Sequence, residues 1–185
     1  MTTRAEFTEE EWARLGRAPL VAGMAITLAD PGGPIEALKE SRAALKTVQE
    51  AAEDGTHGDF VRAVAADVTE RARRRQNPLA GFKPKGPQAG EEILDELRAV
   101  NTLLAEKATP EEVGAFRWWL REAAQRTAKA AKEGGFMGFN AELVSEREQQ
   151  MLERLGEIFS DSEADAEPHG EPDAEPDGER PAQGS

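Results

Sequence analysis

The chain has 185 residues, enough for one domain with its own core, and no cysteine, which excludes disulfides, thiolate zinc sites and cysteine nucleophiles. Its net charge of −13 argues against general nucleic-acid binding, because such binding requires cations that neutralise phosphates. The N-terminus lacks the build of a signal peptide, and no apolar run reaches the roughly 20 residues of a membrane span. We therefore expect a cytoplasmic protein without a membrane span.

The first helix is predicted to begin at Glu9. Thr8 stands at the N-cap with Glu11 three residues further on, which is the spacing of a capping box. Phe7 and Trp12 flank this turn at the spacing of a hydrophobic staple. Both patterns place the start of the helix at the same residue.

Residues 17–19 allow a break or a bend, because proline is tolerated in the first turn of a helix but not in its interior. The next segment, "PLVAGMAITLA", is apolar on every side, which is typical of a helix enclosed by other helices. We predict that it is the central helix. Met24 and Ile26 should then both be buried, although they lie on different faces.

Two amphipathic helices are predicted next, over residues 34–54 and 59–76. The expected buried stripe of the first is Ile35, Leu38, Leu45 and Val48, and that of the second is Val61, Val64, Val68 and Ala72. The segment "NPLAGFKPKGPQAG" then interrupts the pattern with prolines and glycines and is predicted to be a loop.

Three further helices follow the loop. The first carries an apolar face formed by Ile93, Leu97, Val100 and Leu104. A capping box of Thr109 and Glu112 opens the second, whose buried side is Val113, Phe116, Leu120 and Ala124. A third box, Ser145 with Glu148, opens the last helix, whose apolar edge is Met151, Leu152, Leu155, Ile158 and Phe159. No segment alternates as a strand does, so the sequence predicts an all-α bundle of about six or seven helices over residues 6–159.

The C-terminal segment 160–185 differs sharply in composition from the rest. It carries −8 of the net charge, repeats the units "EPHG", "EPDA" and "EPDG", and has no aliphatic residue larger than alanine. Such a segment buries too little apolar surface to offset its ordering entropy, so we predict a disordered acidic tail. Its role is either to keep the protein soluble or to regulate binding.

Catalytic patterns are weak. His57 and His169 are the only histidines, and neither has the partner spacing of a helix-borne zinc motif. The glycine-rich segment near residue 135 has no following lysine and hydroxyl residue of the Walker type. We therefore expect a non-enzymatic protein.

One basic cluster stands out in this acidic chain, formed by Arg71, Arg73, Arg74 and Arg75 at a helix end with Lys83 and Lys85 beyond it. These cations either stabilise the C-terminus of their helix or bind an anionic partner, for which the acidic tail is the nearest candidate. Trp118 points away from the buried stripe of its own helix and is a second candidate for contact with a protein partner.

The loop "GGFMGF" concentrates large apolar side chains between glycines, and it comprises Gly134, Gly135, Phe136, Met137, Gly138 and Phe139. A glycine here can take the left-handed conformation that ends the preceding helix. The aromatic and methionine side chains then either anchor the loop onto the helices or, if exposed, mark a partner surface.

Two segments, "AITLADPGGPIEALKESRAAL" and "AKAAKEGGFMGFNAELVSEREQQML", share one plan of an alanine-rich helix end, a glycine turn and an acidic amphipathic helix. This plan resembles the repeated unit of the TerB-like family, which is associated with tellurite resistance, and especially an uncharacterised bacterial branch of it. The resemblance covers about residues 6–159 and implies a helical domain with a pseudo-two-fold repeat, a role in tellurite, metal or envelope stress, divalent-metal binding and no catalytic residue.

The chain departs from the family pattern at several positions. Pro31 replaces the glycine after Asp30, Lys39 holds the position of a glutamate, and Lys132 with Glu133 stands where aspartate is expected. Few fixed ligands then remain, and those of the first turn are Asp30, Glu36 and Glu40. We predict a weak calcium or magnesium site there, no tighter than about 10⁻⁴ M.

These features lead to two main functional hypotheses, and an enzyme ranks third. The first is a cytosolic binding or adaptor domain of TerB-like type. The alternative is a protein-interaction module whose acidic tail regulates access to the basic cluster. The protein partner and the oligomeric state are not encoded in any recognisable motif.

Overall fold

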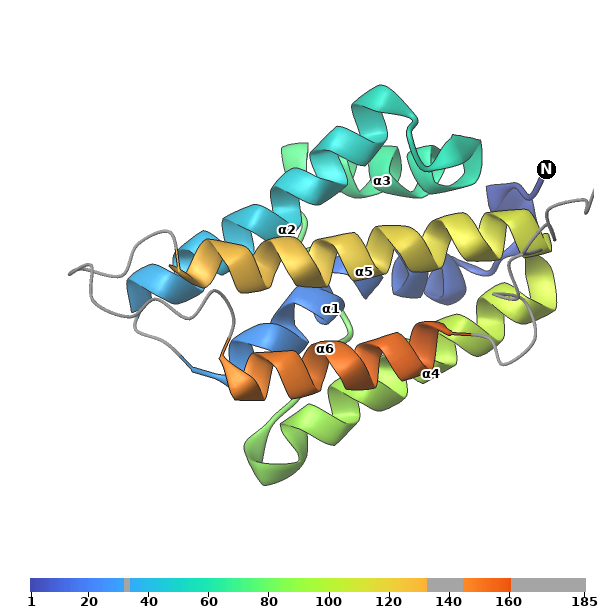
Figure 1. Ribbon diagram of the computed structural model, residues 1–185. Helices are drawn as coiled ribbons and strands as arrows, with labels where there is room; N and C mark the ends of the chain where they lie inside the picture. The colour runs from blue at the N-terminus through green and yellow to red at the C-terminus, as the bar shows by residue number, and fades with distance from the viewer. Residues whose placement is uncertain (32–33, 133–144, 161–185) are drawn as a thin grey trace, which may run out of the picture.

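The computed structural model describes residues 1–31, 34–132 and 145–160, except for the side chains of residues 34–36, 131 and 132. Within these ranges the chain forms six α-helices and two short 3₁₀ helices, and none of the described residues belongs to a β-strand. The predicted all-α helical bundle is confirmed (Figure 1). The loop 134–139 and the tail from residue 161 lie outside the described residues, so the predictions for them stand untested.

The α-helices are α1 (Glu9–Ala29), α2 (Pro34–Asp54), α3 (Gly58–Arg73), α4 (Ala89–Lys107), α5 (Pro110–Lys132) and α6 (Glu146–Phe159). The 3₁₀ helices are η1 (Arg4–Glu6) and η2 (Gly86–Gln88). The bounds of α2 equal the predicted range, and the predicted loop lies between α3 and α4, although α4 already begins within its last residues.

Helix α1 contacts each of the other five helices in the described part of the chain, as a central helix should, and α5 does the same. In Figure 1, α5 crosses in front of α1, with α2 and α3 on one side and α6 and α4 on the other. The second copy of the proposed repeat passes through residues 133–144, which are not described. The pseudo-two-fold repeat therefore stays a prediction.

Pro19 lies inside α1, which continues through it as one helix without the break that the sequence allowed. A proline inside a helix removes one backbone hydrogen bond, and burial of this part of α1 among its neighbours offsets that loss. The prediction of complete enclosure was wrong at Met24, which is only half-buried, while Ile26 is fully buried. Met24 faces a pocket between α1 and α2.

All three predicted capping boxes are present. The hydroxyl of Thr8 accepts from the backbone of Glu11, and the Glu11 carboxylate accepts from the backbone of Thr8. The same reciprocal bonds open α5 at Thr109 and α6 at Ser145. The predicted staple also forms, with the rings of Phe7 and Trp12 5.7 Å apart.

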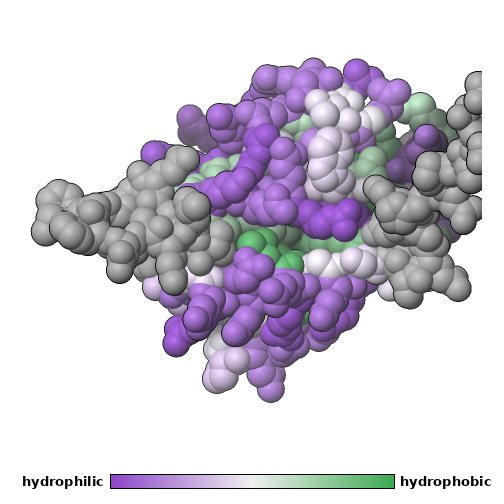
Figure 2. Space-filling model, in the orientation of Figure 1, coloured by the Kyte–Doolittle hydropathy of each residue, from purple (hydrophilic) through white to green (hydrophobic). Residues whose placement is uncertain are grey.

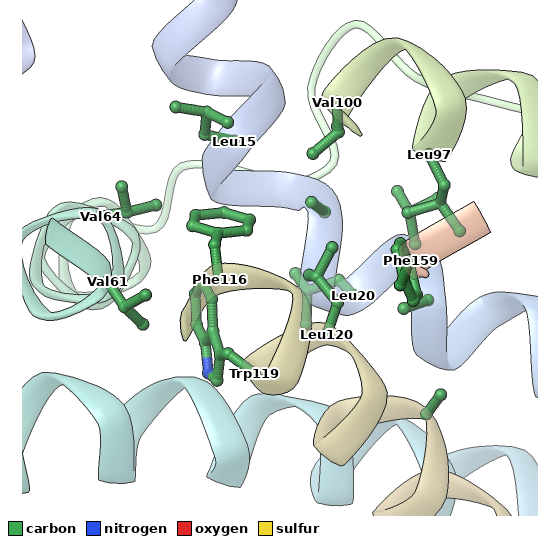
Figure 3. Packing of buried hydrophobic residues seen from close by; sticks show 14 of the residues in the cluster. Leu15, Leu20, Val61, Val64, Leu97, Val100, Phe116, Trp119, Leu120 and Phe159 are labelled. Atoms are coloured by element: carbon green, nitrogen blue, oxygen red, sulfur yellow. The ribbon is translucent and has the colours of Figure 1, made fainter. Parts of the chain in front are cut away.

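The core is built around α5. In Figure 3, Phe116, Trp119 and Leu120 project from this helix toward α1, α2 and α3. The predicted stripes of α4 and α5 are buried, as are Val61, Val64 and Val68 of α3, whereas Ala72 in the last turn of α3 is exposed. On α6, Leu155 and Phe159 are buried, and Met151, Leu152 and Ile158 pack partly buried against the core.

The predicted stripe of α2 was wrong at two positions. Leu38 and Leu45 are 50% and 37% exposed, while Val48 is buried and the Ile35 side chain is not described. The buried face of α2 instead consists of small or polar residues, namely Glu40, Ala44, Thr47, Val48 and Ala51. The cause is close helix packing: a Cβ atom built on Gly23 of α1 would lie 3.1 Å from the Cβ of Ala44. Large leucines do not fit between helices at that separation.

The face shown in Figure 2 is mostly hydrophilic, and hydrophobic residues reach it mainly along the seam between α5 and α6. None of the helices in the described ranges combines the length and the apolar character needed to cross a bilayer.

Candidate ligand-binding site

A pocket with a volume of about 330 Å³ lies where α1, α2 and the loop after α3 meet. Its apolar lining comes from Leu20 and Met24 of α1, Ala44 and Leu45 of α2, and Pro78 and Leu79 of the loop. Ligand pockets in proteins have volumes from about 300 Å³ upward and mostly apolar walls with a few placed polar groups. This pocket therefore has the size and the character that a small ligand requires.

Glu40 is the charged residue in this lining. The residue is only 2% exposed, and its Oε2 atom has no hydrogen-bond partner. Within the described residues Glu40 forms no ion pair, and neither a lysine nor an arginine lines the pocket. Buried carboxylates are normally paired, because an unpaired charge in an apolar environment is strongly destabilising. Glu40 is thus a residue of the pocket wall whose carboxylate has an oxygen without a partner in the described protein.

A more open groove adjoins the pocket and shares Met24 and Leu79 with it. Leu28 of α1 and Phe82 of the loop extend the apolar surface along this groove. The pocket is therefore continuous with a second, mainly apolar surface, which Lys83 also lines.

The predicted metal ligands are only partly placed by the structure. Asp30 is the C-cap residue of α1, Glu40 is buried in the pocket, and the side chain of Glu36 is not described. Within the described residues no group of three or more acidic, histidine or cysteine side chains is arranged to hold a metal ion. The weak divalent site at Asp30, Glu36 and Glu40 therefore stays a prediction.

Several residues of the basic cluster pair with acids of their own helix. Arg71 bonds Asp67, and both Arg73 and Arg74 contact Glu70. These pairs are of the kind that stabilises a helix end, the first of the two roles considered for the cluster. Arg75, Lys83 and Lys85 are exposed and form no ion pair within the described part of the chain.

Trp118 is 47% exposed, which agrees with the prediction that it points away from the core. Its ring packs on His57, which directly precedes α3, with 4.3 Å between the ring centroids. The arginines lie at the opposite end of α3, a helix of 16 residues and therefore about 24 Å long. Trp118 and the basic cluster are thus not parts of one surface.

A second, polar pocket of about 230 Å³ lies beside Trp118, between α2 and α5. His57 is buried there, with Nε2 2.9 Å from Oε2 of Glu122. Neither ring nitrogen of His57 has the geometry of a hydrogen bond, so the imidazole is held mainly by packing on Trp118. Sequence reasoning missed this pairing because 65 residues separate His57 from Glu122 and no local pattern connects them.

Arg126 pairs with two of the three carboxylates that line the polar pocket. Arg126 bonds Glu50 on α2, and its Nη2 lies 2.7 Å from Oε1 of Glu122 on its own helix. The hydrogen bond from Arg126 lowers the pKa of Glu50, and the backbone hydrogen bond from Thr56 lowers the pKa of Asp54. This network ties α2 to α5.

Comparisons of the chain with protein-family models, with curated proteins and with solved structures found no match.

Proposed function

We propose that this chain is a non-enzymatic binding domain that holds a small, largely apolar ligand in the pocket between α1 and α2. One observation carries the proposal: the mostly apolar lining includes one buried acidic residue, Glu40, whose Oε2 has no partner. A residue kept in so unfavourable a state points to a role outside folding, because folding alone gains nothing from it.

We propose a non-enzymatic function because the histidine of the polar pocket does not activate the hydroxyl groups there. The two threonines that line the polar pocket, Thr47 and Thr56, are not activated as nucleophiles: the Thr47 hydroxyl donates to the carbonyl of Ala43, and the ring nitrogens of His57 make no hydrogen bond. A nucleophile requires a base within hydrogen-bonding reach. Binding without turnover is the simpler function for both pockets.

The resemblance of the sequence to the TerB-like family supports the same class of function and predicts a role in the response to tellurite, metal or envelope stress. This assignment is part of the proposal. It predicts that cells lacking the chain become more sensitive to such stress, and that the wild-type chain restores resistance while a variant with a blocked pocket does not.

Leu45 offers a direct test of the binding function because it is half-exposed at the rim of the pocket. The Leu45→Trp variant should obstruct the pocket without disturbing the core. Leu38→Trp is the matched control, since Leu38 lies on the same helix, is exposed and does not line the pocket. In NMR titrations of the full chain with octan-1-ol, the methyl signal of Met24 should shift in the wild type and in Leu38→Trp, and not in Leu45→Trp. Equal shifts in all three proteins would exclude this pocket.

The alternative function, an interaction module, is favoured by a different observation. Arg75, Lys83 and Lys85 are exposed cations without ion pairs among the described residues of an acidic protein. If the acidic segment 161–185 binds them, their backbone amide signals should differ between low and high salt, because exposed charge contacts weaken as ionic strength rises. Salt-independent signals at these three residues would remove the support for this alternative.

A further inference from the structure

The hydrogen-bond donors of Thr27, Ser41 and Leu79 in the pocket wall share one property: each already donates to another group of the protein. The hydroxyl of Ser41 donates to the carbonyl of Ala37 at 2.8 Å, and that of Thr27 donates to Gly23 at 3.4 Å. The backbone N–H of Leu79 donates to Asn77, and Pro78 has no N–H. At Thr27, Ser41, Pro78 and Leu79 the wall therefore has no free hydrogen-bond donor, so a ligand would find acceptors there.

Side-chain acceptors remain at the wall. They are the Glu40 carboxylate and the lone pairs of the Ser41 and Thr27 hydroxyls. A ligand that complements them must donate hydrogen bonds, and the negative charge of a carboxylate favours a cationic donor. An ammonium group supplies three donors and no acceptor, which matches this inventory.

The rest of the wall requires an apolar group attached to that ammonium. Leu20, Met24 and Leu79 line the pocket, and the surface continues past Met24 to Leu28 and Phe82 in the adjoining groove. A volume of about 330 Å³ lies at the small end of the range for ligand pockets. An unbranched alkyl chain of moderate length suits this space better than a fused ring system.

We propose that the pocket binds a primary alkylammonium ion, with its alkyl chain against Met24 and Leu79 and Glu40 as its counter-ion. This inference rests on the proposed binding function and deepens it by naming the class of ligand. Binding would supply the missing partner of Glu40 and would exclude water from the pair. A charge-assisted hydrogen bond in such surroundings is stronger than its neutral counterpart.

The test compares three probes of equal chain length on the full chain: octylamine, octan-1-ol and octanoate. Affinities come from titration calorimetry, and the Met24 methyl signal reports occupancy of this pocket. We expect octylammonium to bind about ten- to a hundredfold more tightly than octan-1-ol, and octanoate to bind most weakly. Equal affinity for the amine and the alcohol, or a preference for octanoate, would overturn the proposal without using any variant.

The Glu40→Gln variant keeps the shape of the side chain and removes its charge. In this variant the ratio of the affinities for octylammonium and octan-1-ol should fall to about one. Glu53→Gln is the matched control, because Glu53 is exposed on the same helix and does not line the pocket. An unchanged preference in Glu40→Gln would overturn the role of Glu40, and so would an equal loss in Glu53→Gln.

General attraction of a cation to an acidic protein must be distinguished from binding in the pocket. Added salt should weaken surface attraction strongly and a buried ion pair much less. Octylammonium that binds without shifting the Met24 signal, or that loses its advantage over octan-1-ol in high salt, would contradict the proposal. If none of the three probes shifts Met24, the proposed binding function itself fails, whereas equal shifts by amine and alcohol refute only the ligand class.

Discussion

Two of the four glutamates of helix α2, Glu50 and Glu40, lie ten residues apart and have opposite surroundings. Glu50 bonds Arg126, lies within 3.6 Å of Lys46, and has a pKa lowered mainly by the hydrogen bond from Arg126. Glu40 is more deeply buried and has neither an ion pair nor a hydrogen bond at Oε2. The first residue has a structural explanation within the described chain, and the second does not.

The contrast shows how to separate structural charges from functional ones in this bundle. Where α2 meets α5, Arg126 pairs with both Glu50 and Glu122, so these charges of the polar pocket are explained by helix association. Where α2 meets α1, the interface is apolar apart from Glu40 and two hydroxyls bonded to their own helices. Of these two pockets, within the described residues, it is the Glu40 pocket whose buried carboxylate has no cationic partner.

The largest effect on stability is expected at Gly23, where α1 and α2 approach each other beside the Glu40 pocket. A Cβ atom there would lie 2.9 Å from Oγ1 of Thr127 and 3.1 Å from Cβ of Ala44. Gly23→Ala should therefore destabilise the fold by about 1 to 3 kcal/mol through overpacking.

The control for this change is Gly114→Ala on α5, where a Cβ atom would meet nothing within 4 Å. That variant should be stabilised by about 0.5 to 1 kcal/mol, because alanine favours the helix. Urea denaturation measures both. A neutral or stabilising Gly23→Ala would show that α1 and α2 are separated more widely than described.

The next largest effect concerns Glu40 itself. Replacing it with methionine, of similar size and apolar, should stabilise the protein without ligand by about 1 to 2 kcal/mol, since the buried carboxylate has an unsatisfied oxygen. The same change at exposed Glu53 should alter the free energy of unfolding by less than about 0.5 kcal/mol. If denaturation shows that Glu40→Met destabilises the fold, the contrast with Glu50 disappears and Glu40 has a structural partner.

A smaller effect is expected from Arg126→Met, which removes the partner of Glu50. Arg126 and Glu50 are both more than a third exposed, so solvent screening limits the loss of stability to below about 1 kcal/mol. The pKa change is the clearer readout. Carbon-13 NMR of the side-chain carboxyl should show the pKa of Glu50 rising toward its ordinary value of 4.5.

The sign of the pH dependence follows from the lowered pKa of Glu50. Its stabilising contribution is present above the ordinary value of 4.5 and is lost as the pH falls through the lowered folded-state pKa. Arg126→Met should reduce this acid-dependent loss. An unchanged Glu50 titration in the variant would mean that Arg126 is not its main partner.

The smallest effect is the predicted weak metal binding. Calcium should bind no more tightly than about 10⁻⁴ M, and Asp30→Asn should abolish binding, because a tight site needs several converging oxygen ligands. Calorimetry in low salt on the full chain measures this. Micromolar affinity that also depends on Glu40 would assign the unpaired carboxylate to a metal ion and would compete with the alkylammonium proposal.

Much of the helical framework could be predicted from the sequence, because its signals act within one or two helical turns. The Thr8, Thr109 and Ser145 capping boxes each join residues three apart, and all three form. The apolar stripes of α4 and α5 likewise identify their buried sides. These features depend on local spacing, which the amino-acid order alone specifies.

The tertiary structure decided which side chains are buried between the helices and which residues line the two pockets. Leu38 and Leu45 follow a helical stripe yet remain exposed, because the close approach of α2 to Gly23 favours Ala44. His57 meets Glu122, and Glu40 enters an apolar wall, only through packing of segments far apart in the chain. The sequence by itself thus determined the helices and the starts of the three that open on a capping box. The separation of the helix axes decided which face of α2 is buried and which carboxylate lacks a partner. No local sequence pattern encodes that separation.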